Sequence, residues 1–594
     1  MTSNEDEFSG RQIYMCYFSV VEDSQKLLHK CKGCDVVANP LSQDVKRGYR
    51  NLVTHVKSVH KSDWETNVRK FLKQTSSGPM DVFLKQPTDK AKSIFSWIEW
   101  IVKGNLPFSF ASEKLTRKNT VLPNISRNTL VYYMKRLTEE VQEIIQLKLP
   151  KTFGLVIDGW TVDQSHFNGI FGSFFDEPTD SIREYLLGCN VGEDVDEDSQ
   201  FVDGLDDSEK SFGFSADDWF DVIINVLWKY EIKHNDVAIN ADNFNKIIEF
   251  ITMDNCSTNR SLARKSEVPM VGCASHRLHL AVEELEGKKE TKNKQGRITQ
   301  AADGYRSVTR KLDLLMGELS TLKNSSLVRS KTSLKPERRN ATRWYSLFKI
   351  LVKYKKLKDI LPQIQNFPPP VLSLIPNEME KAQLMELLED LRKFESVSQM
   401  LQNRSQDRPM LCDVRTLFDN LLEDFGAKYQ LKHLKKDSDI IENKDFENGI
   451  VKIQEHEELN LTQAEKNAVK IFLKPVAASF TPPANGDAEQ PATAYAASVL
   501  LKRKRIEQDK ESAYRETKHV VSTSNICECL FSRAKLLFSP LRKSMKASTL
   551  ETLLFLNANQ NLWPDASIIQ KIIDTPNDDD EEPTEGGSDD DEEF

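Results

Sequence analysis

The sequence predicts a mixed α/β protein that combines a few buried strands with many helices and carries a small zinc-binding module near its N-terminus. Short apolar runs bounded by glycine, as at residues 153–161 and 167–175, are typical of buried strands. Apolar residues at three- and four-residue steps predict helices over much of the remaining chain. Two cysteines and two histidines near the N-terminus have a spacing that suits tetrahedral zinc.

The length and composition indicate a large soluble protein. A chain of 594 residues is long enough for about four domain-sized units and has ample apolar content for their cores. Nine cysteines, an odd number scattered along the chain, indicate a reducing compartment rather than a disulfide framework. No run approaches the apolar length of a membrane span, and the acidic start at residues 4–7 does not resemble a secretory signal.

The net charge of −9 is concentrated in two acidic segments. Residues 193–209 hold nine carboxylates, residues 574–593 hold 12, and neither segment contains Lys or Arg. We expect both segments to be disordered appendages, and the rest of the chain is net basic and suited to nucleic acid. The acidic runs serve either solvation alone or competition with DNA for the basic surface.

The zinc-binding module is predicted from Cys31, Cys34, His55 and His60, which have the spacing C-x2-C-x20-H-x4-H. Two thiolates on a knuckle and two imidazoles on one face of a helix would hold a structural Zn²⁺ ion with no open position. Lys and Arg outnumber Asp in this module, which indicates phosphate contacts, although a protein-binding finger is the alternative. The basic residues that we expect to contact DNA are Lys46, Arg47, Arg50 and Lys57.

Two aspartates follow buried strand patterns further along the chain. Asp158 ends the apolar run that starts at Phe153, and Asp254 follows the run from Ile248 to Met253. Because carboxylate oxygen is the ligand that hard divalent cations select, both residues are candidates for holding Mg²⁺. The alternative is that each aspartate only makes a turn.

Glu528 is the third candidate carboxylate. It lies at the edge of an apolar stripe that begins at Cys527, on a predicted helix, where an isolated charge would be costly to desolvate. It either closes a two-metal site with Asp158 and Asp254 or pairs with Arg533 or Lys535 on the neighbouring turn.

A second predicted helix follows within residues 548–563 and is apolar on more than one face. We consider two interpretations equally: a contact with a second copy of the chain, or burial inside one large domain. The residues that would form the contact between copies are Leu550, Leu553, Leu554 and Leu556.

Two further motifs are less specific. Cys273 and His276 form half of a metal-site pattern without a second ligand pair, so the start of a buried helix is the simpler interpretation. The basic cluster 502–505 is typical of a nuclear localisation signal or a phosphate contact, with an exposed helix face as the alternative.

Several of these motifs together resemble those of hAT-superfamily transposases. They occur in the order found in that family, namely Asp158-Gly159-Trp160, Asp254-Asn255, the Cys273-x2-His276 run, Thr342-Arg343-Trp344 and the stretch 522–563. Residues 12–72 also resemble a BED-type zinc finger, whose aromatic residues would be Tyr17 and Phe18.

The resemblance implies a ribonuclease H-like core interrupted by a large all-α insertion in the 273 residues between Asp254 and Glu528. It implies catalysis by Asp158, Asp254 and Glu528 with Mg²⁺ or Mn²⁺, support of the active site by Cys273 and His276, and DNA contacts from Arg343 and Trp344. Trp344 would stack on an extruded base, and a core tryptophan is the alternative. Cys529 departs from the family, which usually has Arg after the catalytic Glu.

The resemblance also implies the organisation of the chain. We expect a BED-type finger at 12–72, a linker at 73–92, a helical DNA-binding or dimerisation region at 93–148, the first part of the core at 149–290, the helical insertion at 291–510, the last part of the core with the dimerisation region at 511–566, and an acidic tail at 567–594.

The expected function is metal-dependent cleavage and transfer of double-stranded DNA by a nuclear homo-oligomer, a dimer or larger, without a membrane partner. One alternative is a transposase-derived nuclear regulator that binds DNA and dimerises but cuts nothing. Another is a zinc-dependent scaffold that binds only proteins.

Overall fold

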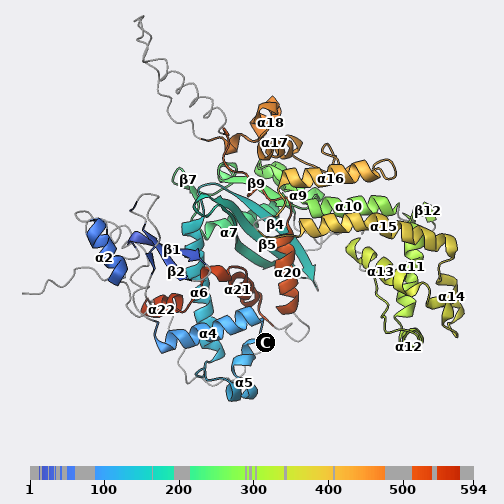
Figure 1. Ribbon diagram of the computed structural model, residues 1–594, viewed down its shortest axis with the longest axis horizontal. Helices are drawn as coiled ribbons and strands as arrows, with labels where there is room; N and C mark the ends of the chain where they lie inside the picture. The colour runs from blue at the N-terminus through green and yellow to red at the C-terminus, as the bar shows by residue number, and fades with distance from the viewer. Residues whose placement is uncertain are drawn as a thin grey trace, which may run out of the picture. The chain divides into compact units, whose positions relative to one another are not determined.

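The computed structural model describes most of the chain (Figure 1). The described residues are 13, 16–23, 26–31, 34, 41–42, 50–60, 64, 68, 87–162, 165–192, 215–287, 291–292, 298–300, 304–339, 344–405, 408–474, 512–537 and 545–575. The acidic segment 193–209, the basic cluster 502–505, Lys46, Arg47, Arg343 and the tail from residue 576 lie outside them.

The chain divides into two compact units. One comprises Met1–Glu99, Ala111–Tyr133 and Asp565–Glu585, and the other comprises Trp100–Phe110, Met134–Pro564 and Gly586–Phe594. No helix among the described residues is long and apolar enough to cross a membrane.

The first unit contains a small antiparallel sheet of β1 (Phe18–Asp23), β2 (Lys26–Cys31) and β3 (Leu41–Ser42), followed by α2 (Arg50–Val59). Leu52 and Val56, one turn apart on α2, are buried together with Tyr17, Phe18 and Trp64. This apolar cluster fixes the helix that carries His55 and directly precedes His60.

The remainder of the first unit is helical. It contains α5 (Lys114–Asn119), α22 (Ser567–Asp574), and the parts of α4 (Asp89–Gly104) and α6 (Arg127–Lys148) that belong to it. α4 starts inside the segment expected to be a linker, because the hydroxyl of Thr88 accepts a hydrogen bond from the amide of Ala91 at 3.2 Å and so caps the helix. Gln570 of α22 accepts a hydrogen bond from the Thr88 amide at 2.8 Å.

The second unit is built on a five-stranded mixed sheet in the order β10-β9-β4-β5-β6. Its strands are β4 (Phe153–Val162), β5 (Ser165–Asp176), β6 (Ser181–Gly192), β9 (Ile248–Met253) and β10 (Met270–Gly272). β4, β5 and β6 form an antiparallel meander, whereas β9 and β10 run parallel to β4. The expected mixed α/β fold class is confirmed.

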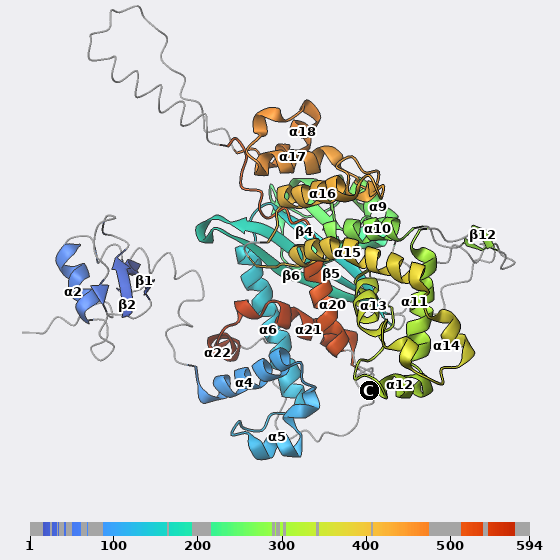
Figure 2. The same cartoon turned by 45° about the vertical axis from the view of Figure 1, so that its right-hand side comes forward.

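Helices cover both faces of this sheet, as Figure 2 shows for α20 (Asn525–Leu537). A Cβ added at Gly169 of β5 would lie 3.1 Å from Leu530 of α20, and one added at Gly159 of β4 would lie 3.2 Å from Trp219 of α7 (Ala216–Trp228). Gly169 pairs with Asp158, the residue before Gly159, and neighbouring residues of a strand point to opposite faces, so α20 and α7 lie on opposite sides of the sheet. α21 (Ala547–Ala558) lies along β6.

The elements that flank β9 and β10 are short. They are β7 (Lys233–His234), β8 (Val237–Ala238), α8 (Phe244–Ile247), α9 (Ser257–Ser266), α10 (Ala274–Glu286), β11 (Thr291–Lys292) and β12 (Ile298–Gln300).

Residues 304–474 are mainly helical where they are described. The expected all-α insertion at 291–510 instead begins with the short antiparallel pair β11 and β12. The helices are α11 (Arg306–Leu319), α12 (Leu322–Arg329), α13 (Trp344–Leu357), α14 (Pro369–Leu374), α15 (Glu378–Leu401), α16 (Leu411–Phe425), α17 (Lys444–Gln454) and α18 (Gln463–Ala468). Leu347 of α13, Leu387 of α15 and Phe418 of α16 belong to one continuous core that α10 and α11 share.

Single 3₁₀ turns complete the fold. They are η2 (Phe108–Ala111), η3 (Glu177–Thr179), η4 (Leu361–Gln363), η5 (Lys432–Leu434), η6 (Glu458–Asn460), η7 (Lys470–Phe472) and η9 (Gln560–Leu562).

Candidate functional site

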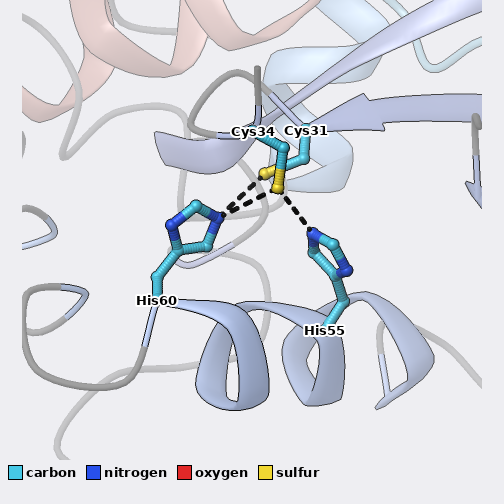
Figure 3. A group of neighbouring side chains, drawn as sticks. All are labelled: Cys31, Cys34, His55 and His60. Atoms are coloured by element: carbon cyan, nitrogen blue, oxygen red, sulfur yellow. Dashed lines mark hydrogen bonds between the residues drawn. The ribbon is translucent and has the colours of Figure 1, made fainter. Parts of the chain in front are cut away.

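Cys31, Cys34, His55 and His60 form a compact group (Figure 3). The Nε2 atom of His60 lies 3.3 Å from Sγ of Cys31 and 3.5 Å from Sγ of Cys34, and Nε2 of His55 lies 3.4 Å from Sγ of Cys34. Sulfur and nitrogen ligands of one tetrahedral zinc ion lie about 3.5 Å apart. The group could therefore hold a metal such as zinc, with two thiolates and two imidazoles as ligands.

Aromatic side chains fix both histidines. The ring of Tyr17 lies 4.9 Å from that of His60, and the ring of Phe18 lies 5.9 Å from that of His55. Burial, with a smaller contribution from the charge of His60, lowers the pKa of His55 and so favours the neutral imidazole that binds a metal.

The predicted DNA contacts of the module are described only in part. Lys57 lies on α2, the helix that carries His55, and its Nζ is 5.3 Å from the centre of the Trp64 ring. Of Arg50 only the backbone is described, and Lys46 and Arg47 lie outside the described residues.

Asp158 lies on β4, and Asp254 directly follows the neighbouring parallel strand β9. Both lie on the same face of the large sheet. The parallel register pairs Val156 of β4 with Thr252 of β9, and each aspartate lies two residues beyond its paired residue. Asp158 does not end its strand as expected, because antiparallel pairing with β5 continues to Val162 after the pairing with β9 has ended. Its Oδ1 atom accepts a hydrogen bond of 2.9 Å from the amide of Gly159.

The segment that leads into α20 crosses this same face. The hydroxyl of Thr252 donates to the carbonyl of Val521 at 2.9 Å, and the thiol of Cys527 lies 3.8 Å from the carbonyl oxygen of Val156. Further along, the ring of Phe531 stacks on Trp160 with 5.9 Å between ring centres. α20 therefore covers the face from which Asp158 and Asp254 project.

Glu528 lies half-buried on the first turn of α20. The two cations that the sequence offered as its partners also make contacts with other residues. Arg533 donates to the side-chain and backbone oxygens of Asn557, and Nζ of Lys535 lies 5.0 Å from the centre of the Trp160 ring.

Asp254 also contacts the motif that contains Cys273 and His276. Nδ1 of His276 lies 3.2 Å from Oδ2 of Asp254, and both side chains are about one-third exposed, at 27% and 34%. Burial opposes protonation of His276, but the hydrogen bond and charge of Asp254 outweigh it and raise the pKa of the imidazole.

Cys273 directly precedes α10, as the alternative interpretation of a buried helix start expected. Its Sγ accepts a hydrogen bond of 3.5 Å from the amide of Ser524, just before α20. Burial raises the pKa of Cys273 to about 12, so the thiol stays protonated and joins β10 to the segment that covers the sheet.

The three carboxylates are not drawn together tightly. Among the described residues, the Cys31 group alone has three or more His, Cys, Asp or Glu ligand atoms that all lie within 4.8 Å of one another. Asp158 and Asp254 thus share a face of the sheet that the helix carrying Glu528 covers, without the three forming a closed cluster.

Trp344 is buried, with 7% of its surface exposed, and belongs to the helical core. It is the first residue of α13, and its backbone amide donates to Nδ1 of His279 at 3.3 Å. This is the position that the alternative interpretation of a core tryptophan describes.

The leucines considered for dimer contacts are also buried. Leu550, Leu553, Leu554 and Leu556 are at most 2% exposed on α21, which packs against β6 and α20 of the same unit. In this conformation the four leucines pack within their own unit, so a contact between copies through them would require α21 to move.

Sequence reasoning missed a buried charged group behind this site. Glu249 on β9 accepts hydrogen bonds from Nη2 of Arg515 at 2.9 Å and from Thr152 at 2.6 Å, and it contacts Nε2 of His519 at 2.7 Å. The sequence signal for this group was Glu249 itself, a carboxylate inside the apolar run of β9, because a buried charge requires polar or charged partners.

No model of a known protein family matches this chain, and no curated protein sequence matches it.

Proposed function

We propose that this protein is a DNA-binding enzyme that cleaves and transfers DNA strands with a carboxylate-held pair of divalent ions, as a hAT-type transposase. The observation that carries the proposal is the placement of three acids. Asp158 lies on one of two adjacent parallel strands and Asp254 directly follows the other, on one face, and Glu528 lies on the first turn of α20, the helix that packs on that face.

The order of the strands supports a ribonuclease H-like core for this proposal. In sequence order, the first three strands of the large sheet form an antiparallel meander, and the next two add in parallel beside the first of them. The helical region interrupts the chain between Asp254 and Glu528, where the resemblance places an insertion.

The donors at this face suit Mg²⁺ or Mn²⁺, because carboxylate oxygen is the ligand that these ions prefer. When bound, such ions would activate water or a DNA 3′-hydroxyl and stabilise the leaving oxygen. His276 orients Asp254 through the contact of 3.2 Å, and Cys273 ties that corner to the segment before α20. We assign to both residues a supporting role.

DNA recognition in this proposal belongs to the finger, with Zn²⁺ as its structural ion and Lys57, Lys46, Arg47 and Arg50 as phosphate contacts. The basic cluster 502–505 supports a nuclear location. We further propose a homo-oligomer, because the cutting of two element ends requires two active sites.

The test is cleavage of labelled element ends by the full chain with Mg²⁺ or Mn²⁺. We expect Asp158→Asn to reduce the rate of cleavage at least about a thousandfold, because it weakens metal binding and so removes the transition-state stabilisation that a metal ion supplies. Asp180→Asn, in a turn between β5 and β6, is the matched control and should cut normally. Equal cleavage by wild type and Asp158→Asn would refute the assignment.

A second candidate is a DNA-binding and dimerising regulator that cuts nothing. The ion pair between Asp254 and His276 favours it, because an imidazolium competes with a metal ion for the carboxylate. Direct titration with Mn²⁺ separates the two candidates. If the protein is the enzyme, Asp158→Asn should weaken its affinity for Mn²⁺. If it is the regulator, wild type and Asp158→Asn should bind Mn²⁺ equally.

A further inference from the structure

The exposed face of α13 carries an aromatic and basic stripe that the sequence motifs did not identify. Tyr345, Lys349, Lys353 and Lys356 follow one another at four-, four- and three-residue steps, which places them on one side of the helix. Tyr345 is 39% exposed, in contrast to the buried Trp344 beside it. Figure 2 shows α13 in the helical region with α11, α12 and α14.

The ring of Tyr345 is held in a defined orientation. Phe348, one turn away, stacks on it with 6.3 Å between ring centres and 20° between ring planes. Phe348 is half-buried and packs against the helical core, so it braces the tyrosine from within. Tyr345 is thus an exposed aromatic surface on a rigid support.

A cation already lies over this ring. Nζ of the exposed Lys349 is 4.8 Å from the centre of Tyr345, so a planar or charged group can reach the ring from solvent. Because Lys349 is long and exposed, it can move aside to a phosphate when a base takes its place on the ring.

The surrounding charge is positive. α13 contains no Asp or Glu, and within the described part of the chain Lys353 and Lys356 have no ion-pair partner. Glu395 of α15, whose charge interacts with that of Lys349, is buried at 8% exposure, and the exposed Glu389 of α15 pairs with Lys355. Lysines one helical turn apart are about 6 Å from each other along the helix, close to the spacing of successive phosphates in an extended strand.

We propose that this face of α13 binds an unpaired DNA strand, with a base stacked on Tyr345 and phosphates on Lys349, Lys353 and Lys356. The inference rests on the proposed function in DNA handling and assigns to that function a single-strand contact separate from the zinc finger. An aromatic ring next to a row of cations is the combination that single-strand binders use, and it requires no base sequence.

The experiment measures binding of the full chain to a fluorescent 20-nucleotide oligonucleotide and to the corresponding duplex. We expect Tyr345→Ala to weaken binding of the single strand about tenfold, the loss of one stacked base, with little effect on the duplex. Tyr345→Phe keeps the ring and should bind within about twofold of wild type. The fluorescence of a 2-aminopurine base in the strand reports stacking directly. Its quenching should disappear with Tyr345→Ala and remain with Tyr345→Phe.

The lysines are tested by salt dependence. Replacing Lys349, Lys353 and Lys356 with Ala should reduce the slope of log affinity against log salt by about 2 for the single strand. Lys466→Ala, on the exposed face of α18, is the matched control and should leave the slope unchanged.

Two outcomes overturn the inference. One is unchanged single-strand binding by Tyr345→Ala. The other is competition by polyglutamate as effective as that by the oligonucleotide, which would identify a surface for acidic peptides.

Cleavage is measured separately. If wild type cuts no DNA and Tyr345→Ala still loses single-strand binding, the cutting proposal alone fails. Normal cutting with binding unaffected by Tyr345→Ala overturns only the contact on α13.

Discussion

Glu249 and His519 join strand β9 of the large sheet to the chain segment that covers the sheet, through a contact of 2.7 Å between Oε2 and Nε2. The side chains are 0% and 5% exposed, although 270 residues separate them in sequence. Burial opposes ionisation of Glu249, but the hydrogen bond and charge of His519, with help from Arg515 and Thr152, outweigh it and lower the pKa of the carboxyl.

This lowered pKa predicts loss of stability in acid. A carboxyl whose pKa is lower in the folded state contributes stability above its ordinary pKa near 4.5, and the contribution is lost as the pH falls through the folded value. Glu249→Gln should lower the free energy of unfolding by about 3 kcal/mol at pH 7 and should flatten its decline below pH 4.5. Chemical denaturation at a series of pH values measures both effects.

Glu455→Gln, just beyond α17 and exposed, is the control for that experiment. It should match wild type at every pH. An acid profile of Glu249→Gln that parallels wild type would show that the pair does not link folding to protons.

The structure requires a glycine at residue 154, on the sheet that carries the candidate site. A Cβ at this position would lie 2.0 Å from the ring of Phe250, which is fully buried on the neighbouring strand β9. Gly154→Ala should therefore destabilise the second unit by at least about 2 kcal/mol, because the ring has no room to move. Thermal unfolding followed by circular dichroism measures the loss.

Gly317 is the matched glycine. It lies in α11, and a Cβ there meets nothing within 4 Å. Gly317→Ala should raise stability by about 0.5–1 kcal/mol, the ordinary gain of alanine over glycine in a helix. Similar effects of the two substitutions would contradict the packing between Gly154 and Phe250.

The cysteine and histidine group predicts a metal-dependent first module. Cys31→Ser should abolish bound zinc and unfold the module, because small metal sites of this type supply the folding free energy. Metal content by mass spectrometry and filter binding of DNA at two salt concentrations measure the result. Cys16, in the same apolar cluster but outside the metal group, supplies the control Cys16→Ser, which should retain one zinc per chain.

Trp344 and Tyr345 predict opposite consequences of truncation. Trp344→Ala removes a ring buried in the helical core and should cost about 3–5 kcal/mol of stability. Tyr345→Ala removes an exposed ring and should change stability by less than about 1 kcal/mol. Melting curves of both variants decide whether the tryptophan is structural, and equal destabilisation would contradict this division of roles.

The sequence predicted the parts of the fold that depend on local pattern. The spacing of Cys31, Cys34, His55 and His60 was enough to predict that the four ligands meet, because a knuckle and the C-terminal part of one helix present them. The apolar runs at β4 and β9 similarly predicted buried strands.

Relationships between distant segments were beyond the sequence. No local pattern states that Thr252 contacts Val521, or that Arg533 donates to Asn557. The burial of α21 was equally undetermined, because an apolar helix has the same pattern whether it covers β6 or a second copy of the chain.

The long separation between β9 and α20 also has a consequence during synthesis. The face of the sheet that carries Asp158 and Asp254 is complete once β10 has been made, yet its cover, with Val521, Cys527 and Phe531, is made about 250 residues later. At ordinary translation rates this interval lasts roughly 12–50 s. The ribosome-bound chain therefore carries an uncovered apolar face throughout that time, and a chain that ends prematurely anywhere in the helical region would retain it as a surface for chaperones or aggregation.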